Sequence, residues 1–331
     1  MPAVEQQSGN VLSPVRQSFM QLKEYMNGCI VGQSALVDKL LIALLANGHL
    51  LVEGAPGLAK TKAIKKLSEA LEGDDQRIQF TPDLLPSDIT GSDIYRPETG
   101  QFVFQKGPVF HNMILADEIN RAPAKVQSAL LEAMAERQVT VGGKTYALPE
   151  LFMVMATQNP IEQEGTYPLP EAQLDRFLMY VRIGQPNAEA ERKILRLVRD
   201  EELKQDAVKL EVIAQSSVFA ARREVLNVHL SPALEEYIVQ LIMATRHPEA
   251  YGDKFARWSA YGASPRGTIA LDRCARARTW LAGRDYVLPE DIHAVVHDVL
   301  RHRIILTFEA EAEGVTPDSF LDVLLSRVPL P

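Results

Sequence analysis

The chain has 331 residues, 46% hydrophobic and 24% charged, and a formal net charge of −8. This length predicts about two or three globular domains, and the composition is sufficient for a large core. The acidic balance disfavours tight non-specific binding to nucleic acid, and the two widely separated cysteines, Cys29 and Cys274, indicate a reducing compartment without a disulfide framework.

The N-terminal segment has the composition of a loose polar tail over its first dozen residues and contains no apolar signal-peptide region. The longest apolar run, "LLIALLA", is much shorter than the ~20 residues that span a bilayer. We therefore expect no membrane span, and a soluble cytoplasmic protein.

The next segment alternates between helix and strand patterns. "SALVDKLLIALLANG" has apolar residues at helical spacing and ends at Gly48, whereas Leu50, Leu51 and Val52 have the character of a buried strand. A loop and a second helix, "KAIKKLSEAL", follow, and "RIQF" is a short second strand.

The loop after the first strand has the residue types that bind nucleotide phosphates. It consists of Gly54, Ala55, Pro56, Gly57, Leu58, Ala59, Lys60 and Thr61. Glycines allow backbone N–H groups to surround phosphate oxygens, and a helix N-terminus adds unpaired donors and a favourable dipole. In this pattern Lys60 reaches the outer phosphates and the Thr61 hydroxyl ligates Mg²⁺. Ala59 departs from the general pattern, which has glycine before the lysine, and a Gly/Pro-rich turn with a surface lysine is the structural alternative.

Further along, two stretches have the composition of β-hairpins between apolar strands. "SDIYRPETGQFVFQKG" has short alternating runs punctuated by Pro and Gly, and "QVTVGGKTYAL" turns at Gly142 and Gly143. Between and after them, "NMILADE", "LFMVMATQN" and "FLMYVRI" are apolar strands, and "KVQSALLEAMAE" is a helix. Apolar strands that alternate with helices predict an α/β fold with a parallel sheet covered on both faces.

Two carboxylates, Asp117 and Glu118, follow the strand in "MILADEIN". In nucleotide hydrolases of this layout the first acid helps to hold Mg²⁺, and the second polarises the water that attacks the γ-phosphate. A lone acid at a strand end is common in α/β proteins. Two in a row, some sixty residues after a phosphate loop, instead favour nucleoside triphosphate hydrolysis.

From Asn187 onward, helical patterns dominate and strong strand signals vanish. Ser231 and Pro232 have the types expected at a helix N-cap and first position, and Gly283 can end a helix. We therefore place a domain boundary between residues 185 and 189.

The ordered motifs resemble those of the AAA+ ATPases and, more narrowly, the MoxR family. The similar segments are "GAPGLAKT", "DEINRAP", "ATQNP", "EGTYPLPEAQLDRF", "GASPRG" and "VLRHRIILTFEAEAEG". In that family's own phosphate loop, alanine commonly precedes the lysine, as Ala59 does here. The resemblance implies a P-loop αβα sandwich with a parallel five-stranded sheet, followed by an all-α lid. It gives an N-terminal tail over residues 1–14, a nucleotide-binding domain with hairpin inserts over residues 15–186, and a lid over residues 187–331.

The resemblance also assigns roles to single residues. Asn159 matches the sensor-1 position, which orients the attacking water, and Arg176 matches the arginine finger, which a neighbouring subunit supplies. Arg266 matches the sensor-2 arginine carried on the lid near the phosphates. A structural ion pair for Arg176 and a solvated helix-start arginine for Arg266 are the alternatives. The segment "IVGQ" resembles the region near the adenine, which adds Val31, Gly32 and Gln33 as candidates.

The family implies an ATPase that binds ATP with Mg²⁺ and works as a homo-oligomeric ring, a hexamer. It further implies that the cycle remodels or matures a client protein complex, often with a partner that has a von Willebrand factor A domain. One alternative is a motor on DNA or RNA with Lys106 and Lys144 near the hairpins as contacts, and the acidic net charge argues against it. A second is a nucleotide-binding switch with little turnover, which the intact acid pair, Asn159 and Arg176 disfavour. The hairpins could face a pore or a client, or pack on their own ring.

Overall fold

The structure is a computed structural model that describes residues 12–160, 165–202 and 211–331. Residues 1–11, which carry most of the predicted tail, lie outside these ranges. The first helix, α1 (Pro14–Cys29), begins at a proline and is capped by the Ser13 hydroxyl, which accepts a hydrogen bond from the Arg16 backbone N–H at 3.1 Å.

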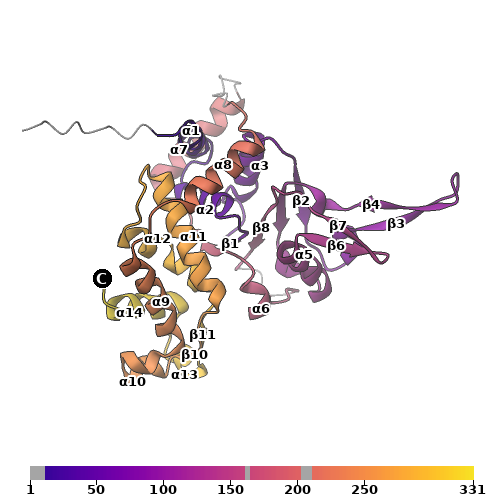
Figure 1. The fold of residues 1–331 in the computed structure, drawn as a ribbon. Coiled ribbons are helices and arrows are strands. Elements are labelled where there is room, and N and C mark those ends of the chain that lie inside the picture. The colour runs from indigo at the N-terminus through magenta and orange to yellow at the C-terminus, as the bar shows by residue number, and fades with distance from the viewer. Residues whose placement is uncertain (1–11, 161–164, 203–210) are drawn as a thin grey trace, which may run out of the picture.

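A five-stranded parallel sheet forms the centre of the nucleotide-binding half, as the resemblance predicts (Figure 1). Its strand order is β2-β5-β8-β1-β9. The strands are β1 (Leu50–Glu53), β2 (Asp75–Gln79), β5 (Met113–Asp117), β8 (Met153–Gln158) and β9 (Met179–Arg182). All neighbouring pairs run parallel, so their carboxyl ends lie at one edge of the sheet.

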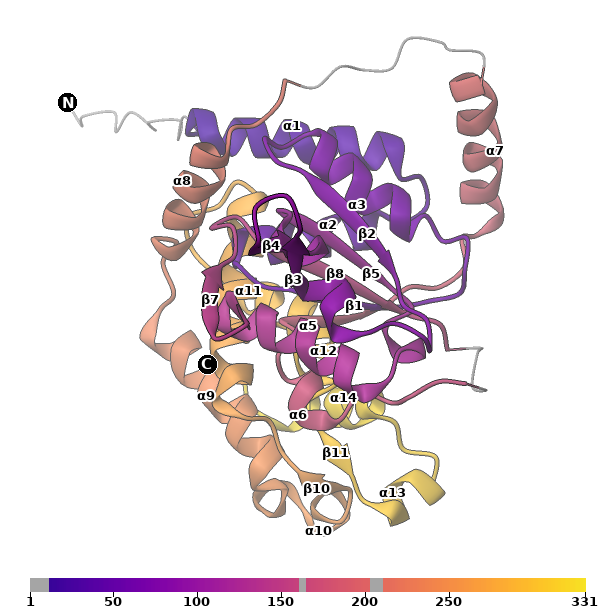
Figure 2. The same cartoon turned by 90° about the vertical axis from the view of Figure 1, so that its right-hand side faces the viewer.

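Helices cover both faces of this sheet because successive strand residues point to opposite sides. Leu50 and Val52 belong to one buried cluster with α1, α2 (Ser34–Leu45) and α3 (Lys60–Glu69). Leu51 belongs to another cluster with α4 (Pro86–Thr90) and α5 (Ala124–Glu136). Figure 2 shows the sheet with α1 and α3 on one side and α5 on the other.

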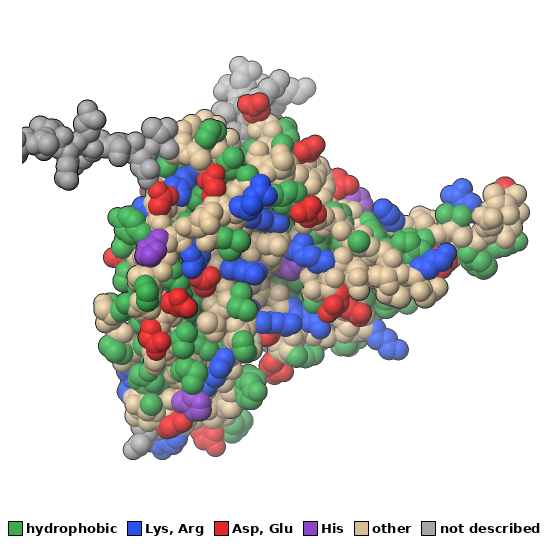
Figure 3. Space-filling model, in the orientation of Figure 1, with side chains coloured by type: hydrophobic (Ala, Val, Ile, Leu, Met, Phe, Trp, Pro, Cys, Tyr) green, Lys and Arg blue, Asp and Glu red, His purple; other side chains and the backbone are tan. Residues whose placement is uncertain are grey.

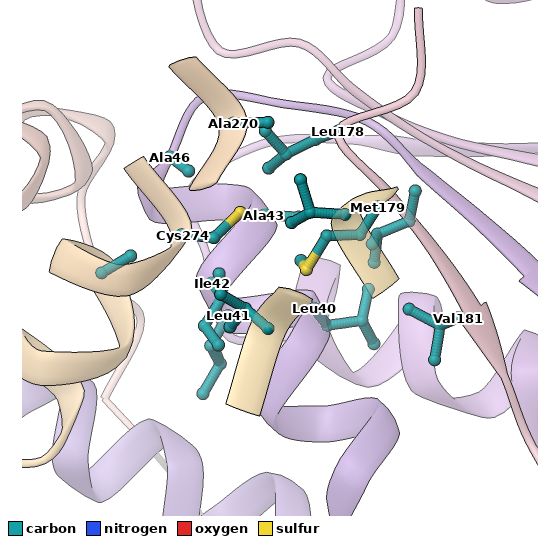
Figure 4. Packing of buried hydrophobic residues seen from close by; sticks show 14 of the residues in the cluster. Leu40, Leu41, Ile42, Ala43, Ala46, Leu178, Met179, Val181, Ala270 and Cys274 are labelled. Carbon is teal, nitrogen blue, oxygen red and sulfur yellow. The ribbon is translucent and has the colours of Figure 1, made fainter. Parts of the chain in front are cut away.

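The second half of helix α2, residues 40–45, is apolar throughout and buried, as expected of a helix segment that packs on more than one side. Figure 4 shows its residues between Met179 and Val181 of β9 and Cys274 of helix α11 (Pro265–Leu281). Leu40, Leu41 and Ala43 are fully buried there. The core of the sheet domain is therefore continuous with that of the helical region.

Both predicted hairpins are confirmed. The first consists of β3 (Gly91–Arg96) and β4 (Gln101–Lys106) and extends away from the body of the molecule (Figure 1). The second consists of β6 (Gln138–Val141) and β7 (Lys144–Ala147), and its turn uses positive φ at Gly142 and Gly143. Phe104 of the first hairpin stacks on Tyr146 of the second, with ring centroids 4.0 Å apart.

The C-terminal region is mainly helical, as the pattern predicts. Its longer helices are α7 (Ala188–Glu202), α8 (Gln215–Leu226), α9 (Pro232–Arg246), α11, α12 (Pro289–Leu300) and α14 (Pro317–Arg327). Ser231 caps α9, with Pro232 at its first position. The C-terminal region also contains the short helices α10 (Asp253–Ala256) and α13 (Phe308–Ala312) and the 3₁₀ helix η3 (Pro248–Tyr251). The short helix α6 (Glu171–Leu174) and the 3₁₀ helices η1 (Pro108–Phe110) and η2 (Ile119–Arg121) lie earlier in the chain.

One feature of this region was not predicted: a small antiparallel pair, β10 (Ser259–Tyr261) and β11 (Ile305–Leu306). Strand β9 ends at Arg182 and α7 begins at Ala188, while the domain division between residues 186 and 187 stays a prediction. Within the described residues, no helix combines the length and apolar character that a membrane crossing requires.

Candidate nucleotide-binding site

The loop between β1 and α3 has the backbone of an anion cradle. Gly57 has a φ of 83°, and Ala59, the N-cap residue of α3, has φ 57° and ψ 18° in the left-handed region. No side chain caps α3, so its first N–H groups are available to a ligand. Such uncapped donors at a helix start, with the positive end of the helix dipole, favour phosphate oxygens.

The structure gives the departure at Ala59 a physical meaning. Glycine, which the general pattern has here, adopts positive φ without cost, whereas alanine pays roughly 1 kcal/mol in steric strain. Ala59 nevertheless adopts the left-handed conformation that the loop needs. A Cβ group is thus compatible with the cradle.

Lys60 lies inside the loop that it closes. Its Nζ donates a hydrogen bond to the backbone oxygen of Gly54 at 2.6 Å. Burial lowers the pKa of Lys60, while the charges of Asp117 and Glu118 raise it. The ammonium group is therefore partly desolvated and close to both acids, where an added phosphate group would stabilise its charge.

Asp117 ends β5 and is held on both carboxylate oxygens. Its Oδ1 accepts a hydrogen bond from the Thr157 hydroxyl at 2.6 Å. Its Oδ2 accepts from Arg77, at 2.7 Å from Nη2 and 3.2 Å from Nε. Arg77 thus places a positive charge beside the acid that is predicted to help hold Mg²⁺.

Glu118 follows Asp117 with φ 56°, a second non-glycine residue in the left-handed region. Its backbone N–H donates to the Thr157 hydroxyl at 2.9 Å. Its Oε2 accepts from Gln79 Nε2 at 2.9 Å and from Arg121 Nη1 at 3.1 Å. The carboxylate of the predicted base therefore has a fixed orientation at the sheet edge.

Sequence reasoning missed the side chains that orient the two acids, Arg77, Gln79 and Thr157. The first two belong to "RIQF", which was interpreted only as a short strand. In the sheet, Gln79 pairs with Asp117 and Arg77 with Leu115. Polar residues two apart at the end of this edge strand were the available signal, because they share one face.

The phosphate loop and the two acids line one cavity of about 430 Å³ at the carboxyl edge of the sheet. Its lining is Pro56, Gly57, Leu58, Ala59, Lys60, Thr61, Lys62, Arg77, Asp117, Glu118 and Asn159. Asn159 is buried directly after β8. The Thr61 hydroxyl and the Asp117 carboxylate are hard oxygen ligands of the kind that suit Mg²⁺ bound with a nucleotide. The cavity thus unites the loop, both acids and Asn159.

Val31, Gly32 and Gln33 are outside the described lining of that cavity. Gln33 Nε2 donates a hydrogen bond to the Gly184 backbone oxygen at 3.1 Å. Helix α7 packs beside Gly32, and a Cβ atom placed on Gly32 would lie 2.9 Å from the Cβ of Ala190. The neighbouring Ile183 packs against Gly54 at the start of the phosphate loop. Their predicted role near the adenine stays a prediction.

Arg176 lies elsewhere in the fold. Its Nη1 donates to the Leu131 backbone oxygen at 2.7 Å, and it lines a separate cavity with Glu136 and Gln138. Within the described residues Arg176 forms no ion pair, so no carboxylate there supports the alternative in which Arg176 is part of a structural ion pair. Arg176 is half-buried at the opposite edge of the sheet, just before β9 begins.

Arg266 also lies away from the phosphate cavity. It starts α11, and its Nη1 is 3.7 Å from Oδ2 of Asp175, the residue before Arg176. Asp175 also accepts hydrogen bonds from the Ser264 hydroxyl at 2.9 Å and from Arg303 Nε at 2.9 Å. Arg266 is thus paired with the residue that precedes Arg176 in the chain.

Comparisons with known proteins agree with this geometry. Residues 49–179 match the model of the ATPase family associated with various cellular activities (AAA). Residues 256–323 match the AAA lid domain. The first match spans the phosphate loop, both acids, Asn159 and Arg176, and the second contains Arg266.

Similar proteins extend the agreement over most of the chain. Chaperone MoxR1 of Mycobacterium tuberculosis is 47% identical over 91% of this chain and 79% of its own length. Protein MoxR of Paracoccus denitrificans is 34% identical over 95% and 96%. A solved structure from Cytophaga hutchinsonii, provisionally described as an ATPase, has a TM-score of 0.88 and 46% identity over 96% of both chains. The phosphate loop, the acid pair and these relatives together establish that the chain is an ATPase of the MoxR family of AAA proteins.

Proposed function

We propose that this ATPase hydrolyses ATP with Mg²⁺ in the cavity at the carboxyl edge of the sheet, and that its cycle remodels a client protein complex. One observation carries the proposal: Lys60, Thr61, Asp117, Glu118 and Asn159 line the same cavity. In phosphoryl transfer, catalysis consists mainly of positioning groups and stabilising charge. The residues gathered here suit both tasks.

The roles follow from the chemistry of each group. Uncapped N–H groups of the loop and α3 bind phosphate oxygens, and Lys60 neutralises the outer phosphates. Bound Mg²⁺ would supply charge neutralisation between the phosphates, with Thr61 and Asp117 as its protein ligands. Glu118 takes the proton of the attacking water, and Asn159 orients that water. For Glu118 to act, its oxygen held by Gln79 and Arg121 must remain within reach of the water.

We further propose that the chain acts as a homo-oligomeric ring, a hexamer. Arg176 and Arg266 do not line the phosphate cavity of their own chain in its described part. A neighbouring subunit would place both arginines near the nucleotide of the next, where a supplied arginine is worth ~10³–10⁵ in rate. The ion pair of Arg266 with Asp175 supports a shared action of the two.

The client role is supported by the relative from M. tuberculosis, which is named a chaperone. The β3–β4 hairpin exposes Phe102, 71% accessible, and Tyr95, 52% accessible, far from the nucleotide cavity. A client, together with a partner that has a von Willebrand factor A domain, fits the family resemblance. Cytoplasmic location belongs to the same proposal.

The test is phosphate release from ATP over a range of protein concentrations. We expect specific activity to rise with concentration, because a neighbour completes each site, and to vanish in Glu118→Gln while ATP binding persists. Lys60→Ala should lose ATP binding, and unchanged affinity would refute the assignment of the phosphate loop. Mixing Lys60→Ala with Arg176→Ala protein should restore part of the activity. No recovery would overturn the action of Arg176 across subunits.

The same experiments bear on the two alternatives. A motor on DNA or RNA predicts binding that weakens steeply with salt, and no binding at low salt removes it. A nucleotide switch predicts ATP binding without phosphate release at any protein concentration.

A further inference from the structure

A further cavity, distinct from those of the phosphate loop and of Arg176, lies at the edge of the sheet where the strands begin. It has a volume of about 410 Å³ and lies between the end of α5, the segment before β8, and helix α8. Its lining is Asn47, Arg137, Leu148, Pro149, Glu150, Phe219, Arg222 and Arg223. Three arginines face one glutamate there. Figure 3 shows Lys and Arg side chains across the middle of this face, over α8 and beside α5.

Arg137 occupies a conformation that long side chains rarely adopt. It is the C-cap of α5, with φ 52° in the left-handed region where glycine is usual. Its guanidinium donates to the Glu150 backbone oxygen at 3.1 Å and to Asn47 Oδ1 at 2.6 Å. An arginine in a strained cap position, with its charge turned toward a cavity, suggests a role for that charge.

Arg222 enters the same cavity from α8. Its Nε donates to the Leu44 backbone oxygen at 2.9 Å, and its guanidinium lies 5.7 Å from the centre of the Phe219 ring. Burial, and next the charge of Arg137, lower the pKa of Arg222 to about 10. The charge of Arg137 therefore disfavours the charged form of Arg222 in a partly desolvated place, and the charge of Glu150 offsets this effect in part.

The charge of Glu150 compensates this cluster only in part, by raising the pKa of Arg137 and of Arg222. Within the described residues, neither Arg137 nor Arg222 forms an ion pair, and Glu150 meets Arg137 through its backbone oxygen rather than its carboxylate. The hydrogen bonds above use two N–H groups of Arg137 and one of Arg222. A guanidinium carries five, so donors remain for a ligand.

We propose that Arg137, Arg222 and Arg223 form an oxyanion-binding site that receives a carboxylate or phosphate group. Paired guanidinium groups are suited to planar or tetrahedral oxyanions because each can donate two parallel hydrogen bonds. An anion would also relieve the repulsion between Arg137 and Arg222. The exposed side chain of Arg223 adds a third charge at the cavity mouth.

The position of the site suggests where the anion comes from. Arg137 lies between Glu136 and Gln138, and both of these line the cavity that contains Arg176. If Arg176 reaches a neighbouring subunit, the site lies on the same subunit interface, and a carboxylate of the second copy would fill it. This identification rests on the proposed ring, whereas the existence of the site does not. The other source of the same chemistry is a free phosphate species.

The first experiment tests the site without assembly or turnover. In a Lys60→Ala background, which disables the phosphate loop, thermal unfolding is followed with sodium pyrophosphate and with sodium chloride at equal ionic strength. We expect pyrophosphate to raise the melting temperature more than chloride does. Adding Arg137→Gln and Arg222→Gln should weaken this binding at least about tenfold, since charged hydrogen bonds are lost.

Two further variants keep the test decisive. Arg196→Gln with Arg199→Gln removes the same charge from exposed positions of α7 and should leave the pyrophosphate effect unchanged. Arg223→Gln, at an exposed side chain, keeps the buried contacts and should weaken the effect by a smaller factor. Equal effects of pyrophosphate on the melting temperatures of all these variants would overturn the site. The site would also be overturned if pyrophosphate and chloride had equal effects on the Lys60→Ala protein and the second experiment, described next, showed no assembly defect.

A second experiment distinguishes the two sources. Sedimentation velocity with ATP, on protein that retains Lys60, compares the Arg137/Arg222 variant with the α7 control. Weaker assembly in the first alone identifies a carboxylate of the second copy as the ligand. Unchanged assembly, together with specific pyrophosphate binding, identifies a free phosphate species. Failure of both experiments refutes the site and leaves the ATPase assignment untouched, because neither measures turnover.

Discussion

Arg77 lies beside Asp117, the acid that we propose as a ligand of Mg²⁺, so its removal should change how strongly ATP binding depends on Mg²⁺. The guanidinium is 2.7 Å from Asp117 Oδ2 and must give up at least part of this contact when a metal ion approaches that oxygen. The Arg77 side chain is 53% exposed and that of Asp117 14%. Because the Arg77 guanidinium is the exposed partner, we assign the pair the upper value for an exposed ion pair, about 1 kcal/mol.

The perturbation is Arg77→Gln, and the quantity is the ratio of ATP affinity with Mg²⁺ to ATP affinity with a chelator. An energy of about 1 kcal/mol corresponds to a factor of about five in this ratio. We expect the ratio to rise by that factor. With Mg²⁺, the variant has no Arg77–Asp117 pair to break when the metal binds, so its ATP affinity should rise. Without Mg²⁺, the variant lacks a cation near the phosphates, so its ATP affinity should fall.

The assay is equilibrium binding of a fluorescent ATP analogue, with circular dichroism as the test of folding. Arg96→Gln, on an exposed position of the β3–β4 hairpin, is the matched control and should leave the ratio unchanged. A folded Arg77→Gln protein with an unchanged or smaller ratio would show that Arg77 and the metal do not compete for Asp117.

Three other predictions concern stability, each measured as the free energy of unfolding in urea. His49 is buried with its Nδ1 accepting from the Val154 N–H, and burial lowers its pKa to about 3 from an ordinary 6.5. Below pH 6.5 the unfolded chain binds a proton at this histidine that the folded protein does not bind, so the free energy of unfolding should fall by up to about 1.4 kcal/mol per pH unit. His49→Asn should reduce this dependence on pH, and an unchanged dependence would contradict the assignment to His49. Ala59→Val should lower stability by about 2 kcal/mol and Ala59→Gly should change it by less than about 1, because only glycine accepts positive φ freely; equal effects would contradict the strain. Asp175→Asn should lower the free energy of unfolding by about 3 kcal/mol, because it leaves buried Arg303 without its counter-charge. As a control, Asp322→Asn, at a 70% exposed carboxylate, should lower it by less than about 0.5 kcal/mol. Equal losses in the two variants would contradict the stabilising role of the Asp175–Arg303 pair.

Much of the candidate site could be predicted because its parts are local in sequence. The phosphate loop is one strand, one turn and one helix start, so Gly57, Lys60 and Thr61 carry their chemistry within a few residues. Asp117 and Glu118 likewise follow directly from an apolar strand. The strand–helix alternation was enough to predict the parallel sheet, because strands buried on both faces must be apolar throughout.

The neighbours of these motifs could not be predicted in the same way. Arg77 and Gln79 meet the acids only because β2 pairs with β5 in a register that sets Gln79 opposite Asp117. That pairing depends on how the connections between the strands cross the sheet, and no short window of sequence contains it.

What the sequence by itself determined is the set of residue types in the cavity: a phosphate loop, two adjacent acids after one strand and a polar residue after another. Only the tertiary structure decided which groups orient the acids and where the distant arginines lie. Arg176 and Arg266 are 90 positions apart in the chain, yet Arg266 pairs with Asp175, the residue before Arg176. A motif can be recognised from the residue types within a few positions of the chain. Contact between residues that are far apart in the chain depends instead on how the helical C-terminal region packs against the sheet domain.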